Sequence, residues 1–180
     1  VDWLKPSNEP VRDTIHQAVL STVSRVGYEQ ATINRICRAA GISSGSLFAR
    51  YQSKADVVIE TYQQMLVNGI AEDAAAMAAV ATDPDPDRAY VEYHIARLSP
   101  EHRDFNVLQL EMLRLATHQP QFREAWDDIQ AFIDESYDTH YQAKSGKEAL
   151  AAEQLYLRAS TRWGWRFLAV ALPYLSTLPL

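Results

Sequence analysis

The chain has 180 residues, of which 47% are hydrophobic, and it carries a formal net charge of −6 from 17 basic and 23 acidic residues. This apolar content is enough for a packed core and excludes a largely disordered chain. No apolar run approaches the roughly 20 residues that span a bilayer. The N-terminal residues lack the basic stretch followed by an apolar stretch that a secretory signal has. The lone Cys37 cannot form an internal disulfide, as is usual in a reducing compartment. We therefore expect a cytoplasmic protein without a membrane segment.

The charge is unevenly distributed along the chain. The first 54 residues hold seven basic and four acidic residues, a net charge of +3, so the remainder carries −9. Affinity for a phosphate backbone depends on local positive charge, because lysine and arginine release the counterions of the DNA. The sign of the split therefore favours a DNA-binding head on an acidic body.

Helical patterns follow one another along the chain, and no run of alternating β-branched residues predicts a strand. The first helix is expected to begin near Ser7 or Asn8, with Pro10 in its first turn, and to end at Gly27. A face of apolar and small residues at spacings of three and four supports it.

Two shorter helices come next. One is expected to begin at the N-cap Thr32 and to stop at Gly41. The other is expected to start after Ser43 and to run to about Tyr51. Such a pair, joined by a tight glycine turn, can place its second helix in a major groove while the first crosses the DNA backbone. A helical corner in a bundle would show the same spacing.

The rest of the chain also reads as helices. Ser53 and Asp56 stand three apart, like a capping box, at the start of a long helix that extends toward Ala81. A polar segment with two prolines at 82–87 breaks the pattern. Further helices are expected at about 87–98, 101–118, 121–143 and 147–172.

The stretch around the glycine turn carries a recognisable set of residues. Gly27-Tyr28 ends the first helix, Thr32 starts the second, and three blocks follow without gaps: Ile36-Cys37-Arg38-Ala39-Ala40-Gly41-Ile42-Ser43, Gly45-Ser46-Leu47-Phe48 and Tyr51-Gln52-Ser53-Lys54. From Ile15 through Lys54 the chain resembles the DNA-binding domain of the tetracycline-repressor (TetR) family of transcriptional regulators. The resemblance implies an all-α fold of about nine helices, with a three-helix helix-turn-helix domain at 1–54 and a larger ligand-binding and dimerisation domain at 55–180.

The same resemblance implies a function. The chain would be a homodimeric DNA-binding regulator, a repressor that an unidentified small-molecule effector releases from a palindromic double-stranded operator, with no enzymatic activity, cofactor or metal. The implied DNA-binding residues are Thr32, Ser43, Ser44, Gly45, Ser46, Phe48, Ala49, Arg50 and Lys54. Phe48 departs from the family pattern, because the family often has a tyrosine there that donates to phosphate.

The resemblance and the apolar stripes of the later helices predict an effector pocket and a dimer interface. The effector pocket is expected between the long fourth helix and the fifth to eighth helices, lined by Met65, Tyr90, His94, Glu111, Met112, His118 and Trp126. The dimer interface is expected to include Phe132, Tyr137, Trp163, Arg166, Phe167 and Val170. For the pocket residues and for the apolar residues of the interface, packing in the core of one subunit is the alternative. The arginines that recur every four residues at 158–166 are expected to form ion pairs within or across the dimer. The alternatives are that one of them faces the pocket or that they are simply solvated.

Two other classes of protein remain as alternatives. An all-helical enzyme or di-iron protein would need paired Glu-x-x-His motifs, and none of the five histidines has a glutamate three positions before it. A protein-interaction adaptor without DNA binding would expose an apolar third helix, whereas Ser44, Ser46 and Arg50, which are expected at outward positions of that helix, are polar.

Overall fold

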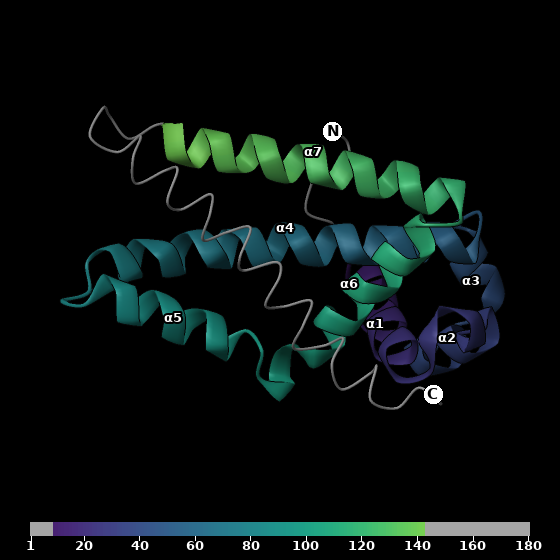
Figure 1. Ribbon diagram of the computed structural model, residues 1–180. Helices are drawn as coiled ribbons and strands as arrows, with labels where there is room; N and C mark the ends of the chain where they lie inside the picture. Colours follow the sequence, from purple (N-terminus) through teal and green to yellow (C-terminus); the bar gives the residue numbers. More distant parts are fainter. Residues whose placement is uncertain (1–8, 143–180) are drawn as a thin grey trace, which may run out of the picture.

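The computed structural model describes residues 9–142, and in this range it contains seven α-helices, one short 3-10 helix and no strand (Figure 1). The predicted all-helical fold is thus confirmed for the described residues. The helix expected at 147–172 lies outside them. The elements are α1 (Pro10–Gln30), α2 (Ile33–Ala40), α3 (Ser44–Phe48), α4 (Lys54–Ala81), α5 (Pro86–Ala96), η2 (Pro100–His102), α6 (Arg103–Ala116) and α7 (Pro120–Gln142).

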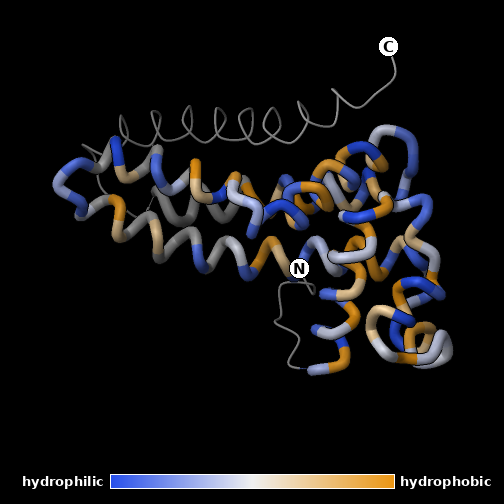
Figure 2. Tube along the Cα trace, turned by 90° about the horizontal axis from the view of Figure 1, so that it is seen from below, coloured by the Kyte–Doolittle hydropathy of each residue, from blue (hydrophilic) through white to orange (hydrophobic). Residues whose placement is uncertain are grey.

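The three N-terminal helices gather at one end of the long helix α4 (Figure 1). Helix α1 packs against α2, α4 and α6, and α7 packs against both α4 and α6. Helix α5 folds back along the far part of α4 after the segment Thr82–Asp85. Asp85 caps α5 by accepting a hydrogen bond from the Arg88 N–H, and this connection is hydrophilic (Figure 2).

Helix α1 differs from the prediction at both ends. It begins at Pro10, whose missing N–H is not needed in a first turn. Gly27 does interrupt the helix, with φ 75° and ψ 163°, but a further turn continues to Gln30. Helix α3 is also shorter than expected and ends at Phe48, although the Tyr51 N–H still donates to the Leu47 carbonyl.

The core of the described residues is one continuous cluster that extends across the predicted domain boundary at 54/55. Ile15, Ile36 and Leu47 of the N-terminal helices belong to the same buried cluster as Val57 of α4 and Leu108 of α6. In the body, the Tyr62 ring stacks with the rings of Phe105 and Trp126, with centroid distances of 5.7 Å and 6.2 Å. The N-terminal helices are thus packed directly onto the body.

No helix in the described part of the chain combines the length and the apolar character needed to cross a membrane.

Candidate nucleic-acid interface

Helix α3 is held in place by caps that the sequence encodes locally. Thr32 Oγ1 accepts a hydrogen bond from the Arg35 N–H and Ser43 Oγ accepts one from the Ser46 N–H, so both short helices are capped. Between them Gly41 adopts φ 66°, and the Ile42 N–H donates to the Cys37 carbonyl. These contacts form the predicted turn between α2 and α3.

The outer surface of α3 is small and polar apart from one aromatic ring. Ser44, Gly45 and Ala49 are exposed, and Leu47 is fully buried against the core. Phe48 is 51% exposed, which is unusual for a ring in a folded chain with a continuous core. This face of α3 thus offers serine hydroxyls that can contact base edges and an apolar ring that can contact a thymine methyl group, and at Gly45 no side chain intervenes.

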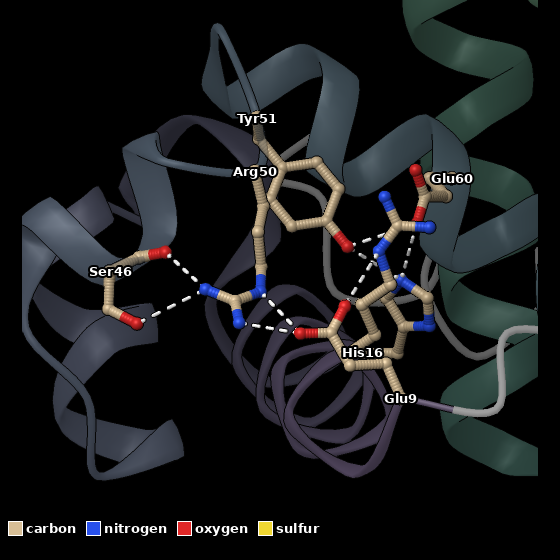
Figure 3. A network of polar contacts seen from close by, with 7 residues as sticks. Glu9, His16, Ser46, Arg50, Tyr51 and Glu60 are labelled. Carbon is tan, nitrogen blue, oxygen red and sulfur yellow. Dashed lines mark hydrogen bonds and ion pairs between the residues drawn. The ribbon is translucent and has the colours of Figure 1, made fainter.

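Arg50, predicted to point outward, is instead engaged within the protein (Figure 3). Its Nε donates to the Glu9 carboxylate at 3.1 Å and its Nη2 pairs with the same oxygen. Its Nη1 donates to the Ser46 carbonyl at 3.0 Å, and only 25% of the side chain is exposed. The guanidinium therefore links the start of α1 to α3.

Behind Arg50 lies a cluster of polar side chains that sequence reasoning missed (Figure 3). The Tyr51 hydroxyl donates to Glu60 Oε1 at 3.0 Å, and His16 Nε2 lies 3.1 Å from that hydroxyl and 3.3 Å from Glu60 Oε1. Arg12 Nη1 lies 3.5 Å from the same carboxylate oxygen. The only hint in the sequence is a histidine on the apolar face of α1, next to Ile15.

The cluster shifts the pKa of two of its members. Burial by itself would raise the pKa of Glu60, but the hydrogen bonds from His16 and Tyr51 and the charge of Arg12 outweigh it and lower that pKa. Burial, together with the neighbouring Glu60 carboxylate, raises the pKa of Tyr51. Glu60 therefore stays ionised and ties α4 to α1 and to the end of α3.

Lys54 is also engaged within the protein. Its Nζ donates to the Tyr28 carbonyl at 2.8 Å and lies 3.9 Å from the centroid of the Tyr28 ring. Burial lowers the pKa of this ammonium group. An ammonium group has three donors, so a phosphate at the start of α4 can still be bound by the remaining ones.

The kink near the end of α1 contacts the body. The Tyr28 N–H donates to Glu111 Oε2 at 2.9 Å, and Arg114 of α6 holds the same carboxylate at 3.1 Å. The Tyr28 ring packs edge-on against Phe122 of α7, with centroids 5.1 Å apart. The irregular backbone at Gly27 thus presents a donor to α6, which a regular helix would not do.

The residues predicted to line an effector pocket have different environments where the structure describes their side chains. Met112 is fully buried in the core, Glu111 is held by Tyr28 and Arg114, and Trp126 stacks on Tyr62. Met65 is half-buried and His118 is exposed at the end of α6. The side chains of Tyr90 and His94 lie outside the described ones.

Most of the predicted dimer residues lie outside the described part of the chain. Phe132 is half-buried on α7, and the side chain of Tyr137 is not described. Trp163, Arg166, Phe167 and Val170, with Arg158 and Arg162, belong to the segment after Gln142.

Cys37 lies buried in α2, where burial raises the pKa of its thiol, as suits a packing residue.

Known proteins share both the motif and the fold. The family model described as "Bacterial regulatory proteins, tetR family" matches residues 18–61. The HTH-type transcriptional repressor AcnR of Corynebacterium glutamicum is 30% identical over 133 residues, which make up 73% of this chain. The match covers 63% of that relative, so the chain spans less than two thirds of its length. The fatty acid metabolism regulator protein of Bacillus subtilis is 22% identical in a match that covers 54% of this chain and 50% of that protein.

A solved structure extends the likeness beyond the motif. The crystal structure of a TetR-family transcriptional regulator from Mesorhizobium loti superposes with a TM-score of 0.66, covering 89% of this chain and 83% of the other. Their sequences are only 15% identical, so the superposition speaks for the fold alone. Motif, sequence relatives and fold agree: residues 18–61 match the tetR family of bacterial regulatory proteins, and the fold is similar to that of a TetR-family regulator.

Proposed function

We propose that the chain is a DNA-binding transcriptional regulator that acts as a repressor. The observation that carries the proposal is the capped helix α3, which exposes Ser44, Gly45, Phe48 and Ala49 on a core-anchored frame. A recognition helix needs this combination, because side chains can read base edges only if their backbone is fixed relative to the groove. The relative from Corynebacterium glutamicum is named as a transcriptional repressor, which supports the same reading.

In this proposal the DNA-binding residues are those predicted from the sequence. Thr32 and Ser43 lie at the N-termini of α2 and α3, where free backbone N–H groups favour phosphate oxygens. Lys54 adds a cation at the start of α4, and Arg50 adds one beside α3. Phe48 lacks a hydroxyl, so it contributes apolar contact only.

We further propose a homodimer that reads a palindromic operator and loses affinity when a small molecule binds the body at 55–180. A two-fold protein matches a two-fold site, and an effector can change the affinity only by binding one of two conformations more tightly. The direct packing of α1 on α4 and α6 supports this proposal, because it provides contacts through which the body can reposition the head.

The test is selection of duplexes from a random-sequence library by the full chain, followed by titration of the selected duplex and of an unrelated duplex at several salt concentrations. We expect a selected consensus and an affinity that falls steeply as salt rises. Ala49→Glu should abolish selective binding, because it places a carboxylate on the exposed face of α3. Gln121→Glu adds the same charge at an exposed position of α7 and should leave binding unchanged. The absence of a consensus, with no salt dependence, would overturn the proposal.

A further inference from the structure

Arg50 and Glu9 form an ion pair at the edge of the proposed interface. The Glu9 carboxylate occupies two donors of the guanidinium, and Ser46 occupies a third nitrogen through its carbonyl and its hydroxyl at 3.4 Å. Glu9 stands at the N-cap of α1 but its side chain caps no backbone N–H. It instead forms ion pairs with two arginines, Arg50 and Arg12.

A guanidinium paired in this way is a poor partner for DNA. The net charge of the pair is zero, and the carboxylate beside it repels a phosphate that approaches Arg50. Arginine binds a phosphate and a carboxylate in the same way, because the same planar fork of N–H donors contacts the oxygens of either group. Glu9 and a DNA phosphate therefore compete for the same N–H groups.

The surroundings make the exchange feasible. Arg12 Nε lies 3.7 Å from Glu9 Oε2, and 44% of the Glu9 side chain is exposed. When Arg50 leaves, the carboxylate thus keeps a cation and water around it, and no charge is buried without a partner. The Ser46 carbonyl continues to hold Nη1, which keeps the guanidinium beside α3.

We propose that Glu9 is part of the DNA interface and sets its affinity by competing with phosphate for Arg50. This inference rests on the proposed DNA binding. An exposed ion pair changes an equilibrium constant by up to about fivefold, so Glu9→Gln should tighten binding by about twofold to fivefold. The gain should appear for the selected operator and for an unrelated duplex alike, because a phosphate contact carries no sequence information.

The matched control is Asp13→Asn, which removes the same charge from an exposed position in the first turn of α1. In the described part of the chain Asp13 forms no ion pair with Arg50. Each substitution is made in the wild-type chain and again with Arg50→Gln. The affinity gain of Glu9→Gln should disappear in the Arg50→Gln background, whereas any small through-space gain of Asp13→Asn should persist there. Thermal unfolding of each variant checks that the compared chains are folded.

Three results would overturn the inference. Equal gains for Glu9→Gln and Asp13→Asn would show that only long-range charge matters. A gain that persists without Arg50 would show that the ion pair is irrelevant, and a loss of affinity would show that Glu9 braces α3 for binding. If the wild-type chain bound neither duplex, the proposed function itself would fail, and this result is distinct from the other three.

Discussion

The Lys54 ammonium group donates to the main-chain carbonyl of Tyr28 at 2.8 Å and lies 3.9 Å from the centroid of the same tyrosine ring. A lysine at the first position of α4 that resemblance assigns to phosphate binding therefore also joins two helices. Lys54 can join the helices and bind a phosphate, because the Tyr28 carbonyl accepts only one of the three N–H donors of the ammonium group. Loss of DNA binding on substitution of Lys54 must consequently be compared with loss of stability.

We expect Lys54→Met to lower the free energy of unfolding by about 1–2 kcal/mol, since it removes a charged hydrogen bond and a cation–π contact but keeps an apolar stem. Urea denaturation measures the change. Arg38→Met is the control: it removes an exposed cation on the neighbouring helix α2 and should change stability by less than about 0.5 kcal/mol. Equal effects of the two substitutions would show that the contact with Tyr28 contributes nothing.

Gly27 and Gly41 both have positive φ but differ in how much a side chain would cost. Gly41, at φ 66° and ψ 28°, occupies the left-handed region that asparagine tolerates. Gly27, at φ 75° and ψ 163°, occupies a region that is essentially restricted to glycine. A Cβ at Gly27 would lie 3.8 Å from Glu111 Oε2, an ordinary contact, so the cost there is in the backbone.

We therefore expect Gly41→Asn to be nearly neutral and Gly27→Asn to lower the free energy of unfolding by about 1–3 kcal/mol. Urea denaturation of both variants, side by side, measures this difference. Comparable losses at the two positions would mean that the backbone at Gly27 relaxes into an ordinary conformation and gives up the Tyr28 contact with Glu111.

The ionisation of Glu60 should make the free energy of unfolding depend on pH in the acidic range. Its pKa in the folded chain is lowered from the ordinary value of 4.5. A lowered carboxyl pKa contributes stability that is fully present above the unfolded-state value and is lost as the pH falls through the folded-state value. The groups that face Glu60 are His16, Tyr51 and Arg12.

We expect Glu60→Gln to lower the free energy of unfolding at about pH 7 by about 1–3 kcal/mol, the range of a charge-assisted hydrogen bond. Below the unfolded-state pKa the difference from wild type should shrink as the wild-type carboxyl becomes protonated. Denaturant titrations across this pH range measure both effects, with the exposed Asp13→Asn as a control for general charge. A difference that stays constant down to low pH would contradict the lowered pKa.

The local features of the N-terminal helices were predictable. Thr32, Ser43 and Ser53 each accept a hydrogen bond from the N–H three residues later, and Gly41 ends α2 in the left-handed conformation. Each of these features depends on a few adjacent residues, so the pattern of residue types is sufficient to predict it. Gly27 was recognised as a helix breaker for the same reason, although the extra turn after it was missed.

The long-range contacts could not be predicted in this way. Glu9 and Arg50 are 41 positions apart, and Tyr28 and Glu111 are 83 positions apart. Periodicity shows which residues face inward but not which helix they meet, since that depends on how α1, α4 and α6 pack together. Arg50 was therefore expected to be exposed, and the cluster of His16, Tyr51 and Glu60 was not anticipated.

Ser43 combines a structural and a proposed binding role, and two substitutions should separate them. Its hydroxyl caps α3 by accepting from the Ser46 N–H at 3.1 Å. Ser43→Ala should lower the free energy of unfolding by about 1 kcal/mol through loss of the cap. Ser43→Asp should keep the cap, because aspartate is an equally good N-cap residue that also favours a helix N-terminus.

For DNA binding the order should be reversed. Ser43→Asp places a carboxylate where the proposed interface meets phosphate, so it should abolish binding to the selected duplex. Folded Ser43→Ala loses only one neutral contact and should retain most of its affinity. Ser99→Asp, on the distant connection before η2, adds the same charge and should not affect binding. Unfolding and binding titrations on the same preparations measure both orders. If stability and affinity fell together in all the Ser43 variants, Ser43 would be a cap and nothing more, and the contact surface would lie elsewhere on α3.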